Sequence, residues 1–195
     1  MAVVSFTPFP ELFTKNLYLR QLSTDDAQEI FLLRSDPIVN KYLGRPKATH
    51  IDEARAFIDM INSPIKNDKS VFWAICLKDN TGLLGTICLW NFSPEKHRAE
   101  IGYTLLPEFH GKGIMQEAFP AILDFGFNRI QLQAIDAWTT SQNLNSIKIL
   151  ERNHFIRDLK LESGIDRSVD GEDMVIFSLS KRKGLTLNDR KYPLI

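Results

Sequence analysis

The chain has 195 residues, of which 44% are hydrophobic and 25% are charged. It is long enough to bury a core without disulfides or metals, and no apolar run approaches the roughly 18 residues of a membrane-spanning helix. Its 24 basic and 24 acidic residues balance, which argues against nucleic acid or anionic lipid as a partner. Because the N-terminus lacks a secretory pattern, we expect a cytoplasmic protein with one domain over 1–195, a core over about 15–180 and a tail over 181–195.

The first half of the chain reads as one strand followed by helices. Ser23 and Asp26 resemble a capping box, which begins the first helix, and Pro64 is expected to end the last one. Thr49 is expected to cap that last helix, which carries an apolar stripe at helical spacing. The expected ranges are 16–22 for the strand and 23–34, 37–43 and 49–62 for the helices.

The second half predicts a strand meander and then alternating elements. Short connections between the first three strands favour antiparallel pairing, whereas the strand-helix-strand passage that follows implies one parallel pair. The expected strands are 70–77, 83–91, 98–106, 132–138, 155–161 and 173–180, with helices over 114–127 and 143–153. This order predicts a mixed α/β domain with a mostly antiparallel seven-stranded sheet and helices on both faces.

Two cysteines fall on the expected hairpin around residues 79–82. Cys76 should face about residue 85 or 86, which leaves Cys88 roughly 7–10 Å away and too far for a disulfide. We therefore expect both to be small core residues. No group of residues has the spacing of a metal site.

The segment 108–114, Glu-Phe-His-Gly-Lys-Gly-Ile, lies at a strand-to-helix junction. Free amides and the helix dipole favour an anion there, and Gly111 and Gly113 let the backbone approach a phosphate closely. A plain structural turn is the alternative interpretation. The segment does not match a Walker A loop. It does not match the dinucleotide-binding fingerprint either, because Gln116 stands where a third glycine is needed.

The run AEIGYTLLPEFHGKGI, followed by N-x-x-S-x-x-x-L-E-R, resembles the core of GNAT acetyltransferases, especially the RimJ/RimL group, over about residues 15–180. The resemblance implies acetyl-CoA as cofactor, with its pantetheine arm pairing with the strand end at Leu105 and Leu106. Glu108 departs from the usual Gln or Arg, and we expect it to point away from the phosphates. The resemblance assigns the CoA pyrophosphate to Phe109, His110, Gly111, Lys112, Gly113 and Ile114.

Acetyl transfer to an amine needs a neutral nucleophile, oxyanion stabilisation and protonation of the leaving thiolate, but no covalent enzyme intermediate. Glu100 is either a general base, as the resemblance implies, or a structural acid paired with a neighbour such as Arg98. The resemblance places Asn143 and Ser146 near the cofactor, with Ser146 as a candidate general acid, although Asn143 is also a good N-cap. His154 is interpreted mainly as a C-cap residue and otherwise as a base.

The acceptor follows from the pKa of amines and from the resemblance. An N-terminal amine has a pKa of about 8 and lysine of about 10.4, so a weak carboxylate base suits the former. We expect an acetyl-CoA-dependent N-acetyltransferase acting on a primary amine, in particular a protein N-terminus. The alternatives are a polyamine or antibiotic acetyltransferase with Glu100 and Asp136 in an acidic pocket, and a non-catalytic acyl-CoA-binding module. The resemblance places four residues at the acceptor cleft, namely Tyr42, Leu43, Trp90 and Phe92.

A homodimer is also expected, because the last hairpin and the tail could pack on a second copy. We expect no metal ion in the site.

Overall fold

The structure, a computed structural model, describes residues 6–66, 70–93, 95, 97–166, 171 and 173–181. The expected tail therefore lies, apart from Lys181, outside the described residues. Among the described helices, none is long and apolar enough to cross a membrane.

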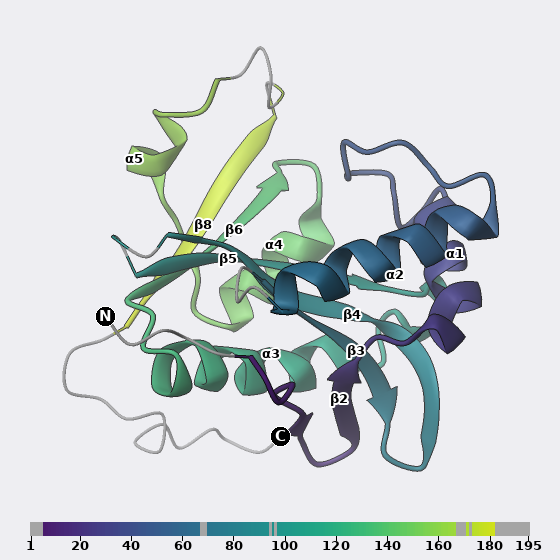
Figure 1. The fold of residues 1–195 in the computed structure, drawn as a ribbon. Coiled ribbons are helices and arrows are strands. Elements are labelled where there is room, and N and C mark those ends of the chain that lie inside the picture. Colours follow the sequence, from purple (N-terminus) through teal and green to yellow (C-terminus); the bar gives the residue numbers. More distant parts are fainter. Residues whose placement is uncertain are drawn as a thin grey trace.

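One mixed sheet, in the order β1-β2-β3-β4-β5-β6-β8-β7, forms the centre of the described chain (Figure 1). The strands are β1 (Leu12–Phe13), β2 (Leu17–Gln21), β3 (Val71–Leu77), β4 (Asn80–Ser93), β5 (Arg98–Leu105), β6 (Ala134–Thr140), β7 (Ile156–Arg157) and β8 (Met174–Ser180). All neighbours are antiparallel except β5 and β6. The mixed class and the parallel pair are confirmed, and the short β1 is an eighth strand that the sequence did not indicate.

Helices cover both faces of the sheet, as expected. The elements are η1 (Thr24–Asp26), α1 (Ala27–Ser35), α2 (Ile51–Lys66), η2 (Pro107–Phe109), α3 (Ile114–Asp124), η3 (Phe125–Arg129), α4 (Leu144–Arg152) and α5 (Leu159–Glu162). One core cluster joins α3 and α4 to the sheet and a second joins α1 and α2 to its other face (Figure 1). We call these the α3/α4 face and the α1/α2 face.

Strand β3 shows why the sheet needs cover on both sides. Trp73 and Ile75 belong to the cluster on the α3/α4 face, whereas Ala74 and Cys76 belong to the cluster on the α1/α2 face. Because successive side chains of a strand point to opposite faces, a strand covered on both faces is apolar throughout. The run Val71–Leu77 has this composition.

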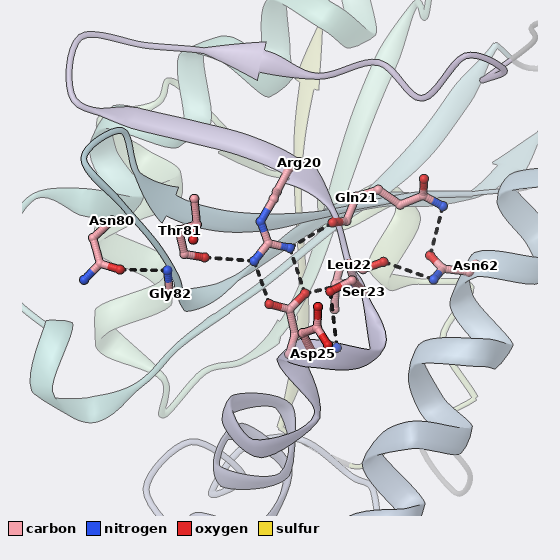
Figure 2. A network of polar contacts seen from close by, with 10 residues as sticks. Arg20, Gln21, Leu22, Ser23, Asp25, Asn62, Asn80, Thr81 and Gly82 are labelled. Atoms are coloured by element: carbon pink, nitrogen blue, oxygen red, sulfur yellow. Dashed lines mark hydrogen bonds and ion pairs between the residues drawn. The ribbon is translucent and has the colours of Figure 1, made fainter.

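A network of polar contacts fixes the start of α1 against the sheet (Figure 2). Arg20 donates to both carboxylate oxygens of Asp26, at 2.8 and 2.6 Å, and to the Thr81 carbonyl at 2.9 Å. The Ser23 amide donates to Asp26 at 2.8 Å, and the Ser23 hydroxyl accepts from the Asp25 amide, so the capping box is confirmed. Since a buried carboxylate is costly unless it is paired, this ion pair ties β2, α1 and β4 together.

The expected helix over 37–43 is wrong, because that segment forms turns. The Asp36 carboxylate accepts from the amides of Ile38 and Val39, and the Asn40 side chain donates to the carbonyls of Leu33 and Asp36. Such side-chain bonds offer the backbone an alternative to helical pairing.

Helix α2 differs from expectation at both ends. Its first helical residue is Ile51, and the Thr49 hydroxyl donates to Glu53 instead of capping an amide. The helix also continues through Pro64 to Lys66. A proline so close to the end removes one helical hydrogen bond while leaving the preceding turns intact.

The expected strand over 155–161 is mostly wrong, because only Ile156–Arg157 pairs with β8. The Asp158 carboxylate then accepts from the amides of Lys160 and Leu161 and begins α5. Strand β6 also begins two residues later than expected.

Both cysteines are free and buried, which confirms that they form no disulfide. The expected register is wrong, however, because Cys76 faces Leu83. The turn is tighter than residues 79–82, since Leu77 pairs with Asn80, and irregularities in the ladder flank Cys76.

Strands β4 and β5 approach so closely at Gly85 that a side chain would not fit. A Cβ atom there would lie 2.2 Å from the Thr104 carbonyl oxygen and 2.8 Å from Leu105 Cα. We expect Gly85→Ala to lower the free energy of unfolding in urea by about 2–3 kcal/mol, because the strands must separate. Gly82→Ala, whose nearest contact is the flexible Asn80 side chain at 3.2 Å, should cost about 0.5 kcal/mol or less; equal losses would contradict this explanation.

Candidate active site

Strands β5 and β6 pair over only three positions and then diverge. Residues 98–100 face 134–136, and within the described chain no residue of β5 beyond Glu100 pairs with β6. The Leu106 amide donates to Leu84 in the direction of β4 at 3.0 Å. Because backbone groups alternate along a strand, those of Tyr103 and Leu105 point the other way. We call residues 101–105 on this side the open edge of β5.

The glycine turn, residues 110–113, follows the open edge directly. Gly111 and Gly113 have φ of 73° and 77°, and Gly113 is the left-handed N-cap of α3. The first amide with a helical partner is that of Glu117, which donates to Gly113 at 2.9 Å. Among the described residues, the amides of 111–116 donate to no protein acceptor. The expected contribution of the Phe109 and His110 amides is wrong, because they donate to the carbonyls of Leu106 and Pro107. This cluster of free donors at a helix N-terminus is a site for an anion.

The charged side chains near the turn are either bonded to other elements or exposed. Burial acts to raise the pKa of Glu117, but hydrogen bonds from Thr14 and Asn16 outweigh it and lower the pKa. These bonds hold the carboxylate against the β1–β2 connection. Glu108 is exposed and Lys112 lies over the Phe109 ring at 5.4 Å.

His110 connects the glycine turn to the open edge. Its Nε2 atom lies 3.0 Å from the Leu105 carbonyl oxygen. The expected pairing of Leu106 with the pantetheine arm does not fit, because the Leu106 amide is already bonded to Leu84. Tyr103 therefore carries free backbone groups for an added strand, whereas at Leu105 the carbonyl oxygen already has His110 as a partner and the amide remains for this pairing.

Glu100 lies on β5 at the point where β6 diverges. Its Oε1 accepts a 2.6 Å hydrogen bond from Asn91 Nδ2. Burial raises the pKa of Glu100 above its ordinary value, Asn91 lowers it and the nearby Asp136 charge raises it, with a net upward shift. A raised pKa is what a carboxylate needs to accept a proton near neutral pH.

Asn91 was not identified from the sequence. It has a φ of 50° and lies at an irregularity of the β4–β5 ladder between Trp90 and Ser93. Asparagine adopts this left-handed conformation more readily than most residues. A bulge of this kind redirects a side chain, here toward Glu100, and has no periodic signal in the sequence.

The suggested pairing of Glu100 with Arg98 is not observed. Arg98 instead makes a bidentate ion pair with Asp136, with hydrogen bonds of 2.8 and 2.5 Å, and also donates to Ser178 at 3.0 Å. Asp136 is buried and is already neutralised by this arginine. It is therefore not a free acid that could attract a cationic substrate.

The start of α4 supplies the other half of the site. Asn143 Oδ1 accepts from the Ser146 amide at 3.2 Å, which confirms the N-cap interpretation. The Ser146 hydroxyl lies 2.7 Å from the Tyr103 hydroxyl. Burial raises the pKa of Tyr103 to about 12, so it stays protonated at neutral pH. Tyr103 was not identified as a site residue from the sequence.

The two halves lie on opposite faces of β5. Tyr103 packs with the cluster on the α3/α4 face, edge-on to Phe119, and reaches Ser146 there. Glu100 is three residues away along the strand, so its side chain is directed to the α1/α2 face. Groups bound on the two faces can meet where the sheet is open, beyond the last β5–β6 pair.

The four expected acceptor residues do not all come together. Trp90 is 46% exposed and is the register partner of Glu100. Tyr42 and Leu43 are partly buried in the loop between α1 and α2. Phe92 instead packs on Phe6, with ring centroids 5.7 Å apart, in the cluster of the α3/α4 face. The structure therefore does not bring Phe92 to Glu100.

His154 directly follows Asn153, the C-cap of α4, with a φ of 65°, and is exposed. Its amide donates to Glu151 at 2.9 Å. The C-cap interpretation is thus confirmed.

Comparisons with known proteins identify the family of the chain. The model of the acetyltransferase (GNAT) domain family matches residues 16–156. An uncharacterized N-acetyltransferase, p20, of Bacillus licheniformis is 33% identical over 177 residues, covering 88% of this chain and 97% of the relative.

Solved structures show the same fold. A putative ribosomal-protein-serine acetyltransferase of Vibrio cholerae superposes with a TM-score of 0.73 at 20% identity, covering 89% of this chain and 99% of that one. RimL, a ribosomal-protein alpha-N-acetyltransferase in complex with coenzyme A, gives 0.75 at 18% identity, covering 88% and 98%.

The fold and the site define an acyl-group transferase, and the chain belongs to the GNAT acetyltransferase family. It is an N-acetyltransferase by this membership. Members of the family use acetyl-CoA.

Proposed function

We propose that this chain transfers an acetyl group from acetyl-CoA to a primary amine, and that the amine is the N-terminus of a protein. The observation that carries the proposal is the open edge of β5, with the unpaired amides of 111–116 at one end and Glu100 at the other. Bound acetyl-CoA supplies the activated acyl group as a thioester.

The residues for acetyl-CoA follow from the free donors. The amides of 111–116 bind the pyrophosphate, and the backbone of Tyr103 and Leu105 pairs with the amide-bearing arm, as a strand pairs with a sheet edge. Asn143 caps α4 and thereby positions Ser146 at the open edge. The C–S bond of the thioester breaks as the C–N bond forms, and Ser146, held by Tyr103, passes a proton to the leaving thiolate. Ser146 regains a proton from solvent, to which Glu100 returns the proton that it takes from the amine.

Glu100 removes the proton from the amine, directly or through water. Its raised pKa brings its proton affinity closer to that of the amine. No protein nucleophile is needed, and Cys88 is unsuited to that role because burial raises its pKa to about 12. The acyl group therefore passes to the amine in one displacement.

An N-terminal amine fits the site better than a polyamine. About a tenth of such an amine is neutral at pH 7, so one carboxylate suffices as a base. An acidic pocket for polycations would need further free carboxylates, but Asp136 is committed to Arg98. The ribosomal-protein acetyltransferases among the structural neighbours agree with a protein acceptor.

An acetyl-CoA turnover assay tests the proposed function. The acceptors are a peptide with a free N-terminus, the same peptide blocked at the N-terminus but containing lysine, spermidine and an aminoglycoside. We expect thiol release and a mass increase of one acetyl group only with the free N-terminus. Binding of CoA without turnover on any amine would instead support a non-catalytic acyl-CoA-binding module. The homodimer and the cytoplasmic location stay predictions.

Removing the Ser146 hydroxyl tests its role as the acid. Ser146→Ala should lower kcat by about 10-fold or more, because general acids contribute roughly 10²-fold at the low end and water can partly replace a serine. Tyr103→Phe, which keeps the ring on Phe119, should lower kcat less. Single-turnover rates with saturating acetyl-CoA measure both. An unchanged rate in Ser146→Ala would reduce Ser146 to a structural role in α4.

A further inference from the structure

Two arginines at the end of α1 and in the loop between α1 and α2 form no ion pair with an acid among the described residues. Arg34, near the end of α1, and Arg45, in the α1–α2 loop, are both partly buried. Arg45 Nε donates to Asn40 at 2.9 Å, whereas the buried Arg34 Nε has no hydrogen-bond partner among the residues that the structure describes. In the part of the chain that the structure describes, no ion pair within 4.0 Å involves either side chain.

The carboxylates of this region are already committed elsewhere. Asp36 accepts from two amides of its own turn. Asp52 pairs with Arg55 and His50. Glu53 lies near enough to favour the charged form of Arg34, but its oxygen accepts from the amides of Thr49 and His50 and from the Thr49 hydroxyl. Neither arginine is thus neutralised by a hydrogen-bonded acid.

This arrangement is electrostatically unfavourable in the free protein. Burial lowers the pKa of Arg34 despite Glu53, and burial together with the Arg34 charge lowers the pKa of Arg45 to about 10. Both remain protonated at neutral pH. Two partly desolvated like charges close to each other are unfavourable, and a nearby anion reduces this cost. A ligand with a negative group would remove this cost.

Arg34 lies on the same face of the sheet as Glu100, and Arg45 is near enough to Arg34 for the two charges to repel each other. The Arg34 guanidinium is 4.2 Å from the centre of the Phe57 ring, and Phe57 contacts Phe72 of β3, with ring centroids 6.2 Å apart. Phe72 of β3 and Gly102 of β5 face the same residue of the strand between them, β4. Glu100 is the neighbouring side chain on this face of β5. The backbones of β3 and β5 are two strand spacings apart, which is roughly 10 Å. About three residues of extended peptide span this distance.

We propose that Arg34 and Arg45 form an anion site that binds a carboxylate carried by the acceptor, a few residues from the amine. The inference rests on the proposed function and narrows its substrate class to amines with a nearby negative charge. The planar guanidinium matches a carboxylate with paired hydrogen bonds. The Asn40 bond holds Arg45 in place for this contact.

The same site repels cationic acceptors. Spermidine and aminoglycosides would place a second positive charge near two arginines that already repel each other. An acidic residue near the N-terminus of a peptide, or a small amine with a carboxylate, supplies the required group. The two carriers share one chemistry and differ in size.

The test uses the full chain and two sets of acceptors. The first set is a hexapeptide amide, serine followed by alanines, with a single glutamate or glutamine at the second, third or fourth position. The second set is free glutamate and free glutamine. We expect kcat/KM to be about 10-fold or more higher for the best glutamate peptide than for its glutamine twin, which is the size of a hydrogen bond to a charged group.

Variants assign the preference to the arginines. Arg34→Gln and Arg45→Gln should each bring the glutamate-to-glutamine ratio close to one. Arg55→Gln is the matched control, because Arg55 lies on α2 and is exposed and paired with Asp52 at 2.7 Å; it should keep the wild-type ratio. Equal loss of the ratio in all three variants would overturn the assignment.

The outcomes separate the two proposals. Equal turnover of all glutamate and glutamine peptides by the wild-type protein overturns the anion site and leaves the N-terminal acetyltransferase intact. A preference for free glutamate with no peptide turnover supports the anion site but rejects a protein acceptor. Efficient turnover of spermidine alone overturns both. The wild-type ratios decide these cases even if a variant fails to fold.

Discussion

Gly113→Asp is expected to abolish binding of CoA while leaving the protein folded. A Cβ atom at Gly113 meets nothing within 4 Å, so a folded variant is expected, but the added carboxylate lies among the amides of the glycine turn. Two like charges about 4 Å apart repel by about 4 kcal/mol at a protein surface, which is about 10³-fold in affinity. Isothermal titration calorimetry with CoA measures the loss.

Gly171→Asp is the matched control for this experiment. Gly171 also has a positive φ, of 95°, and open space around it, so the substitution adds the same charge and a similar backbone strain. It lies just before β8, outside the glycine turn. We expect near wild-type affinity for CoA in this variant. Wild-type affinity in a folded Gly113→Asp protein would exclude the turn as the pyrophosphate site.

Glu100→Gln should preserve binding of acetyl-CoA and lower kcat at pH 7 by roughly 10²–10⁴-fold, the usual contribution of a general base. The loss should shrink as the pH rises toward the pKa of the amine, because more of the acceptor is then neutral without assistance. In the wild-type protein, kcat/KM should decline with falling pH as Glu100 is protonated, at a pH above its ordinary pKa of 4.5. This acidic limb should be missing from the variant.

Stability distinguishes this role from a structural one. Because the pKa of Glu100 is raised on folding, the folded state binds its proton more readily than the unfolded state. Its contribution to stability is therefore full at low pH and declines as the pH rises through the raised pKa. The Glu100→Gln protein should then unfold at pH 7 at a urea concentration no lower than that for wild type. If the Glu100→Gln variant is destabilised but keeps a normal kcat, Glu100 is a structural acid. The control is Glu151→Gln, because Glu151 lies on the exposed surface of α4.

Elements with strong periodicity could be predicted, whereas those set by side-chain bonds could not. The apolar run of β3 and the stripe of α2 follow from burial on one or both faces. The turns after Asp36 depend on that carboxylate bonding to Ile38 and Val39, which competes with the helix expected over 37–43. The short β7 ends where Asp158 caps α5.

The candidate site shows the same division. The glycine turn, Glu100 and the cap at Asn143 were found because each is a local pattern at a fixed place in an element. Asn91 and Tyr103 were missed, because their contacts with Glu100 and Ser146 depend on a bulge in β4 and on the packing of α4 against β5. Long-range contacts of this kind have no signature in a single sequence.

The placement of Glu100 and Ser146 on opposite faces of β5 has a kinetic consequence for the proposed reaction. With acetyl-CoA entering from the α3/α4 face and the amine from the α1/α2 face, neither ligand covers the path of the other. The two can then bind in either order, and initial-rate plots at several fixed concentrations should intersect instead of running parallel. An unreactive acceptor analogue should compete with the amine but not with acetyl-CoA.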